Sequence, residues 1–135
     1  MANSICLDTR ILSMFLKGKK NALDLINEFK DQNRELYTTT INISEFFMGY
    51  YKTNVVTDEK SKKLSEFFLL LNPRPLDYNS AMLSGKLYAQ TLKNNPIGWR
   101  DTFIGAIAML NGKAIITSNT KHFSRIPGLE IVEFH

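Results

Sequence analysis

DTFIGAIAMLNGKAIIT, residues 101–117, is the stretch that decides the fold. Its first part, Asp101 to Leu110, is nearly uncharged and has the length of a helix, and Asn111-Gly112 is a typical helix end. Ala114 to Thr117 follows as an apolar, β-branched run, which predicts a strand. The largely apolar helix that leads into this strand is predicted to lie at the centre of the domain.

Strands and helices alternate on both sides of this stretch. Apolar runs bounded by turn residues predict strands, whereas apolar residues at helical spacing predict helices. The predicted strands are 5–7, 36–39, a short one near Leu76 and 129–132. The predicted helices are 11–16, 23–29, 42–50, 58–71 and 82–92. Thr57 or Asp58 is the predicted N-cap of the fourth helix, and a loop at 94–98 follows the fifth. This order predicts a single domain over residues 1–135, an α/β fold of the three-layer α/β/α type with a mainly parallel sheet and right-handed crossovers.

Composition limits the possible partners and compartments. The net charge of +4 and the pI of about 9.2 modestly favour an anionic partner, although the lysines are scattered. The single cysteine, Cys6, lies in an apolar run and is expected to be a small core residue in a reducing compartment. His122 has only the terminal His135 as a second histidine, so we expect it to be structural or exposed. No apolar stretch approaches the roughly 20 residues of a transmembrane helix, and four residues before the first strand leave no room for a signal segment, so we expect a cytoplasmic protein.

Four polar residues follow predicted strands or begin the helices after them. Asp8 ends the first strand, Glu45 lies in the first turn of the helix after the second, Asp101 starts the apolar helix, and Asn119 follows the strand that ends at Thr117. In open parallel sheets, ligands bind beyond the carboxyl ends of the strands. Carboxylates that gather there repel one another unless a cation intervenes, and hard oxygen ligands suit Mg²⁺ or Mn²⁺.

Each of these residues also has a purely structural explanation. Asp8 can cap the following helix, and Asn42 with Glu45 resembles a capping box. Asp101 can stabilise a helix start through the macrodipole, and Asn119 can serve a turn. The small residues four and five positions after Asp101 permit close packing, which favours a buried functional acid there. For the other three residues both roles stay open.

The ordered set of motifs resembles a known family. The motifs are Leu7-Asp8-Thr9, Ile43-Ser44-Glu45, Asp101 with 103–108, 116–119, His122-Phe123 and 126–129. They look like a PIN domain, and more narrowly like the VapC toxins, over essentially the whole chain. The resemblance implies a parallel sheet of about five strands and a cleft in which Asp8, Glu45 and Asp101 bind Mg²⁺ or Mn²⁺.

The resemblance also implies a function, which is metal-dependent endonucleolytic cleavage of RNA. Asp8 and Asp101 would hold the metal, Glu45 would orient or deprotonate a water molecule on it, and Asn119, at the family's fourth acidic position, would complete the outer shell or help to position that water. In the same strand end, Thr117 and Ser118 are further candidates for substrate contact. Similar toxins form homodimers and are silenced by an antitoxin, so a VapB-like antitoxin and a second copy are the expected partners.

Two stretches of the sequence allow more than one interpretation. Arg10 departs from the family, which usually has a small polar residue after Asp-Thr. It could contact a substrate phosphate, which we favour because the guanidinium fork suits phosphate, or pair with Asp8 and hinder metal entry. The apolar run 67–71 could form part of a subunit interface or belong to the core.

Two other functions compete with RNA cleavage. Arg10 and Asn119 suggest a degenerate PIN-like domain that binds RNA or a protein without cleavage. Asp8 could also be the covalent nucleophile of a phosphatase or phosphotransferase. The best-known enzymes of that kind have a second aspartate two residues on, where this chain has Arg10, which argues against this second alternative.

Overall fold

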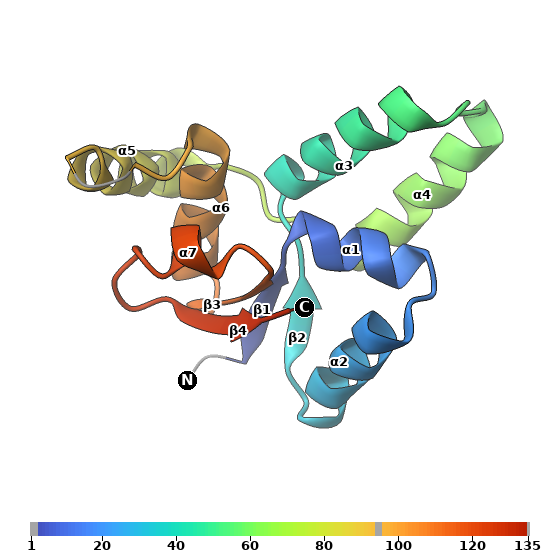
Figure 1. Ribbon diagram of the computed structural model, residues 1–135, viewed down its shortest axis with the longest axis horizontal. Coiled ribbons are helices and arrows are strands. Elements are labelled where there is room, and N and C mark those ends of the chain that lie inside the picture. The colour runs from blue at the N-terminus through green and yellow to red at the C-terminus, as the bar shows by residue number, and fades with distance from the viewer. Residues whose placement is uncertain (1–2, 94–95, 135) are drawn as a thin grey trace.

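The computed structural model describes residues 3–93 and 96–134, and a parallel four-stranded sheet lies at its centre (Figure 1). The strands are β1 (Ser4–Leu7), β2 (Glu35–Tyr37), β3 (Ala114–Thr117) and β4 (Glu130–Glu133). The helices are α1 (Thr9–Leu16), α2 (Lys20–Asp31), α3 (Thr40–Thr53), α4 (Asp58–Leu70), α5 (Tyr78–Thr91), α6 (Trp99–Leu110) and α7 (Thr120–Phe123). The predicted α/β class and parallel sheet are confirmed. Residues 1–2 and 135 of the predicted domain, and residues 94–95 of the predicted loop, lie outside the described residues.

The strand order β2-β1-β3-β4 places a change of direction between β1 and β3. From β1 the chain crosses to β2 on one side, while β3 pairs with the other edge of β1, where Cys6 lies opposite Ile115 and Leu7 opposite Ile116. At such a switch point the loops after the two strands diverge, and a crevice opens at their carboxyl ends. Asp8 directly follows β1 and therefore lies at this crevice.

Two apolar cores cover the two faces of the sheet, because successive strand residues point to opposite faces. Ile5, Leu7 and Ile116 belong to the core that α1 to α4 complete. Cys6 and Ile115 belong to the other core, which α5 to α7 complete. The three predicted layers are thus present, and Cys6 is the free, buried core residue that was predicted.

The fifth strand is the main difference from the prediction. Near the predicted short strand, the structure has an isolated parallel bridge between Thr39 and Arg74. The N–H of Arg74 donates to the Thr38 carbonyl at 2.9 Å, and the N–H of Thr40 donates to the Arg74 carbonyl at 3.0 Å. Pro73 and Pro75 flank Arg74 and have no N–H to continue such a ladder. The described sheet therefore has four strands.

Helix ends also differ in places from the prediction. α3 begins at Thr40, with Thr39 as N-cap, two residues before the predicted start. α6 begins at Trp99, and the short helix α7 replaces a predicted turn. The cap of α4 is Thr57, one of the two predicted caps.

The apolar run 67–71 serves both the core and the surface. Phe68 is 2% exposed and packs in the core, whereas Leu69 and Leu70 are 68% and 85% exposed. In the described part of the chain, no helix combines the length and apolarity needed to span a membrane.

Candidate active site

Asp8 lies between β1 and α1, where its side chain is 8% exposed. It is the N-cap of α1, and its Oδ1 accepts a hydrogen bond from the backbone N–H of Thr9 at 2.9 Å. Asn42 Nδ2 also donates to Oδ1, at 2.9 Å, and Thr117 Oγ1 donates to Oδ2 at 2.5 Å. A cap needs no side-chain donors from α3 and β3. Asp8 is therefore both a cap and a buried carboxylate that three elements hold in place.

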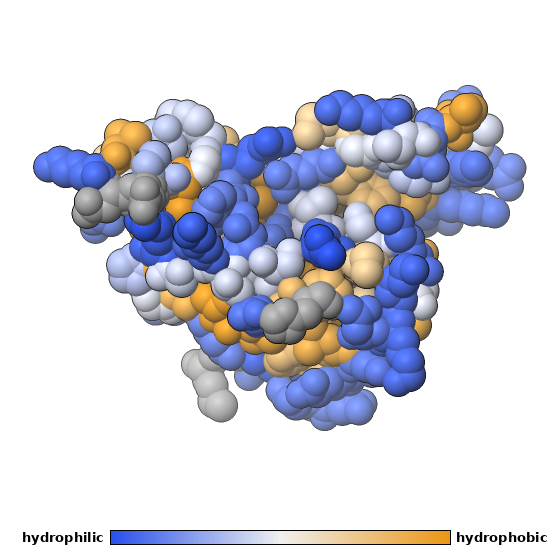
Figure 2. Space-filling model, in the orientation of Figure 1, coloured by the Kyte–Doolittle hydropathy of each residue, from blue (hydrophilic) through white to orange (hydrophobic). Residues whose placement is uncertain are grey.

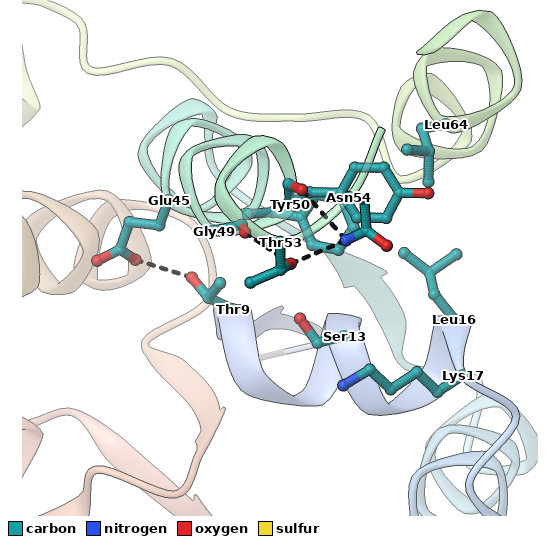
Figure 3. Close-up of a pocket in the computed structure, with 11 residues that line it drawn as sticks. Thr9, Ser13, Leu16, Lys17, Glu45, Gly49, Tyr50, Thr53, Asn54 and Leu64 are labelled. Atoms are coloured by element: carbon teal, nitrogen blue, oxygen red, sulfur yellow. Dashed lines mark hydrogen bonds between the residues drawn. The ribbon is translucent and has the colours of Figure 1, made fainter. Parts of the chain in front are cut away.

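Glu45 lies in the second turn of α3 and points toward Thr9 of α1 (Figure 3). Thr9 Oγ1 donates to its Oε1 at 2.8 Å, and Arg100 Nε lies 3.7 Å from its Oε2. The predicted capping box is wrong, because Thr39 caps α3 and accepts from the Asn42 N–H at 3.1 Å. The carboxylate of Glu45 faces the site instead of a backbone N–H.

Asn42 connects these two acids. Its side chain is fully buried, and its Nδ2 donates to Asp8 and, at 3.0 Å, to Thr9 Oγ1. Its Oδ1 accepts from Thr39 Oγ1 at 2.7 Å. Because donors and acceptors are matched along this chain of hydrogen bonds, Asn42 holds Asp8 and the threonine that contacts Glu45 in one orientation.

Asp101 lies in the first turn of α6 and contacts the segment after β3. Asn119 Nδ2 donates to its Oδ2 at 3.0 Å, and His122 Nδ1 lies 2.7 Å from the same oxygen. A carboxylate oxygen can only accept, so the ring nitrogen of His122 donates. Asp101 Oδ1 receives no hydrogen bond from the described residues, which leaves it available to a ligand.

The three acids share one electrostatic environment. Burial raises the pKa of Asp8, and the charge of Asp101 raises it further, against the hydrogen bonds from Thr117, Thr9 and Asn42 that lower it. Burial also raises the pKa of Glu45, and the charges of Asp8 and Asp101 add to this effect. Residues that are far apart in the sequence therefore repel one another across a single cleft.

This oxygen-rich cleft suits a hard divalent cation. Within residues 3–93 and 96–134, no three His, Cys, Asp or Glu side chains are already arranged as a metal-binding group. Mg²⁺ usually keeps several waters and takes only one or two protein carboxylates, so it does not require such a group. A cation near Asp8 and Asp101 would offset the repulsion that raises the pKa of Asp8. The donor set and the charge of the cleft fit magnesium or manganese.

Comparison with known proteins identifies the family. Residues 5–129 match the PIN domain model. The chain belongs to the PIN-domain family. It is 25% identical over 130 residues to the tRNA(fMet)-specific endonuclease VapC of Salmonella typhimurium, a match that covers 95% of this chain and 96% of the relative.

Solved structures of toxin–antitoxin proteins share the fold of this PIN domain. DNA-bound VapBC from Salmonella typhimurium matches with a TM-score of 0.78 and 21% identity, over 96% of this chain and 97% of that chain. VapBC2 from Rickettsia felis, bound to a DNA fragment of its promoter, matches with a TM-score of 0.77 and 20% identity, over 98% and 99% of the two chains. VapBC-1 from nontypeable Haemophilus influenzae is 27% identical, with a TM-score of 0.68, over 96% and 97%. The predicted resemblance to VapC toxins is confirmed.

A groove of the PIN domain begins beside Glu45. It has a volume of about 710 Å³ and lies between α1 and α3, with Thr9 and Glu45 at one end (Figure 3). Ser13, Lys17 and Asn54 add polar groups to an otherwise largely apolar wall. An extended ligand that reaches Glu45 can therefore continue along this groove.

The structure also places the other residues that were considered for substrate binding. Arg10 is exposed, and among the described contacts it forms no ion pair with Asp8. The interpretation in which Arg10 pairs with Asp8 and hinders metal entry therefore finds no support. Ser118 is exposed, whereas Thr117 is 1% exposed and its hydroxyl donates to Asp8. Thr117 is thus placed to orient an acid and is screened from a large ligand.

Three site residues were not identified from the sequence. Asn42 was interpreted as a cap, His122 as structural or exposed, and Arg100 was not considered. Each has a positional signal in hindsight: Asn42 lies one helical turn before Glu45, and Arg100 directly precedes Asp101. His122 lies three residues after Asn119, which brings both onto one side of the short helix α7.

Proposed function

We propose that this PIN domain is a divalent-metal-dependent endoribonuclease and the toxin component of a VapBC-type toxin–antitoxin pair. The observation that carries the proposal is Asp8, an acid that is 8% exposed, held by three donors and raised in pKa by burial and by Asp101. Folding buries this carboxylate near a second acid, which costs free energy. A residue that only caps a helix does not need such an environment. The relative from Salmonella typhimurium is a tRNA-specific endonuclease, which supports RNA as the substrate class.

Asp8 and Asp101 would hold Mg²⁺ or Mn²⁺, with Glu45 beside them. When bound, the ion supplies charge neutralisation at the phosphate and makes water easier to deprotonate. The protein's own contribution is orientation: Asn42 and Thr117 hold Asp8, while Asn119 and His122 hold Oδ2 of Asp101 and leave Oδ1 free. These contacts would keep the two carboxylates in place before RNA arrives.

Glu45 is the proposed general base. Its raised pKa brings it closer to neutrality, where a base accepts a proton most effectively. A water molecule would attack phosphorus and transfer its proton to Glu45 as the bond from phosphorus to the leaving ribose oxygen breaks, and that oxygen would take up a proton from solvent. Thr9 holds one oxygen of Glu45 at 2.8 Å and so keeps the carboxylate directed into the cleft.

The partners follow from the same site. Relatives of this fold were solved as VapBC complexes, which supports a VapB-like antitoxin for this chain. The groove beside Glu45 is the proposed site for a segment of the antitoxin, and exposed Leu69 and Leu70 are available to a second copy in a homodimer. Arg10 and Ser118, both exposed, are the proposed contacts for RNA phosphates. A cytoplasmic location, where RNA is present, belongs to this proposal.

The proposal is tested by incubating purified protein with labelled RNA in Mg²⁺, Mn²⁺ or EDTA. We expect cleavage by the wild type with either ion, none in EDTA, and a loss of at least about a hundredfold in Asp8→Asn and Asp101→Asn. Asp24→Asn is the matched control, because Asp24 is an exposed acid that forms an ion pair with the exposed Lys20. Equal cleavage by all four proteins would mean contamination and would contradict the proposal. RNA binding without cleavage would favour the non-cleaving alternative.

A further inference from the structure

Trp99 is an exposed aromatic residue that the proposed chemistry does not use. It begins α6, and its indole stacks on the ring of Tyr88 from α5, with centroids 4.2 Å apart and planes 13° apart. Phe103, one turn further along α6, lies at 5.7 Å and is tilted by 43°. Two rings thus hold the indole, yet Trp99 is 56% exposed. The stacked rings therefore present an ordered aromatic surface that solvent can reach.

The position of Trp99 ties it to the cleft. Trp99, Arg100 and Asp101 are consecutive residues in the first turn of α6. Arg100 points to Glu45, and Asp101 points to Asn119 and His122. Residues two apart point to nearly opposite sides of a helix, whereas Arg100 lies between the two positions and reaches toward Glu45. A ligand that passes over Arg100 could therefore contact the acids with one part and the indole with another.

The molecule has a hydrophilic notch and an exposed arginine near this turn. In the space-filling view a notch separates the arm of α5 and α6 from the arm of α3 and α4, and its walls are largely hydrophilic (Figure 2). The N-terminal ends of α1 and α3 lie close together near the centre of the molecule, and α6 begins above and to the left of them (Figure 1). Arg100, whose side chain is 60% exposed, adds a cation between the indole and the acids. Proteins that bind unpaired nucleotides stack bases on aromatic rings and contact the backbone with positively charged side chains.

We propose that Trp99, backed by Tyr88, is a stacking platform for an unpaired base next to the cleaved bond, with Arg100 contacting the adjoining phosphate. The inference rests on the proposed function, because it assumes that RNA occupies the cleft. The stack on Tyr88 fixes the indole before RNA binds, so little side-chain entropy is lost when a base covers its open face. Because every base has a π face, the platform selects unpaired over paired RNA and tolerates different bases.

Tryptophan fluorescence gives a direct test, because Trp99 is the only tryptophan in the chain. The protein carries Asp8→Asn so that RNA is bound without being cut, and the probes are a short fluorescein-labelled single-stranded RNA and an abasic strand of the same length. We expect the RNA to quench the emission saturably, with the same midpoint as the anisotropy of its label. The abasic strand should bind more weakly and leave the emission nearly unchanged.

Variants separate stacking from other roles. Trp99→Ala should weaken RNA affinity about tenfold, as the loss of one stacked base does. Trp99→Phe should stay within about threefold of the parent, because it keeps a π face. Tyr78→Ala is the matched control: Tyr78 is 78% exposed on α5, takes part in none of the ring pairs found among the described residues, and should leave affinity unchanged. In a cleaving background, Trp99→Ala should raise KM about tenfold with little change in kcat.

Other outcomes overturn the platform. RNA binding without quenching, or equal quenching by the abasic strand, would show that no base covers the indole. A changed elution volume of Trp99→Ala in size-exclusion chromatography would make the ring a subunit contact instead. Failure of the nuclease proposal looks different: the Asp8→Asn protein would still show base-dependent quenching, while the wild type would cleave nothing. If the wild type cleaves RNA and no quenching occurs, the stacking proposal is contradicted and the nuclease proposal is not.

Discussion

The burial of the Asp8 carboxylate lowers the free energy of unfolding. Its carboxylate is 8% exposed, and burial followed by the charge of Asp101 raises its pKa above the ordinary value of 3.8. Without metal, we expect Asp8→Asn to increase the free energy of unfolding by about 1 kcal/mol while it abolishes cleavage, as substitutions that relieve a functional strain do. Urea unfolding in EDTA measures the difference.

The pH dependence of this gain follows from the direction of the shift. An acid whose pKa is raised by folding binds its proton more tightly in the folded state, so its cost is complete above the folded pKa and disappears as pH falls toward 3.8. The advantage of Asp8→Asn should therefore be largest near neutral pH and shrink on acidification. An advantage that grows as pH falls would contradict the burial argument. Asp24→Asn, at an exposed site, should show neither effect.

Arg100 lowers the pKa of Glu45. Burial raises the pKa of Glu45, the charges of Asp8 and Asp101 raise it further, and Arg100, 3.7 Å from Oε2, lowers it. Glu45 must be deprotonated to act as the base, so kcat/KM should fall as pH drops through its pKa. Arg100→Gln removes the lowering charge and should move this acid limb to higher pH. A profile of kcat/KM against pH measures the shift.

A lysine at position 100 provides the control. Arg100→Lys keeps the charge and should leave the acid limb near its wild-type position. Because Arg100 is 60% exposed, salt should screen its effect and move the wild-type limb toward that of Arg100→Gln. A limb that moves to lower pH in Arg100→Gln would show that another group sets it.

At the scale of the elements, the sequence predicted every long helix and all four strands of the described sheet. Residues 114–117 were readable because a fully apolar, β-branched run has few other structures open to it. The sequence could not exclude a fifth strand near Leu76. Only the fold shows that the pairing there is limited to one bridge, between Arg74 and Thr39. The start of α3 was misplaced because Thr39 and Asn42 are both good caps, and their mutual hydrogen bonds decide between them.

The site was predictable in its acids and less so in their supports. Asp8, Glu45 and Asp101 stand out because a charge at the end of an apolar strand or in an apolar helix is conspicuous. Asn42 and His122 are ordinary polar residues in the sequence, and their importance comes from contacts with positions more than a dozen residues away. Such contacts are set by strand order, which periodicity does not reveal.

Gly105 lies where α6 packs closely against Ile126 and Phe123. A Cβ added there would overlap Cδ1 of Ile126, which is 2% exposed, and would come within 3.8 Å of Phe123. Gly105→Ala should therefore lower the free energy of unfolding by about 1–3 kcal/mol, as overpacking of a core does. Equilibrium unfolding in urea, with a constant slope, measures the change.

Two further variants isolate the packing effect. Gly85 lies in the interior of α5 with open space around its Cα, so Gly85→Ala should stabilise the protein by about 0.5–1 kcal/mol through helix propensity. Ile126→Val removes the overlapping methyl group, so the loss in Gly105→Ala should be smaller in that background. If both alanine substitutions stabilise equally, α6 is not closely packed at Gly105.

At the scale of the whole molecule, the sheet brings distant parts of the chain to one edge. β1 carries Asp8 near the N-terminus, and β3, its direct neighbour, carries the segment that holds Asp101. α6 spans the distance back to that edge, so the cleft closes only when both halves of the sheet have formed. A ligand that binds both acids therefore stabilises the assembled fold and not a single segment.

Binding of Mg²⁺ should accordingly raise the thermal stability of the entire domain. At a hundredfold excess over Kd the gain is about 2.7 kcal/mol, which for a domain of this size raises Tm by roughly 10 °C. Asp8→Asn and Asp101→Asn should each lose most of this gain. In EDTA, Asp8→Asn should have a higher Tm than the wild type. With magnesium, the wild type should have the higher Tm of these two proteins. Asp24→Asn should follow the wild type, because its carboxylate lies far out on α2 and is exposed to solvent. Scanning calorimetry with and without the ion measures all four proteins. An equal rise in Tm for Asp8→Asn and the wild type would place the bound ion elsewhere on the surface and would remove the support that the buried acids give to metal-dependent cleavage.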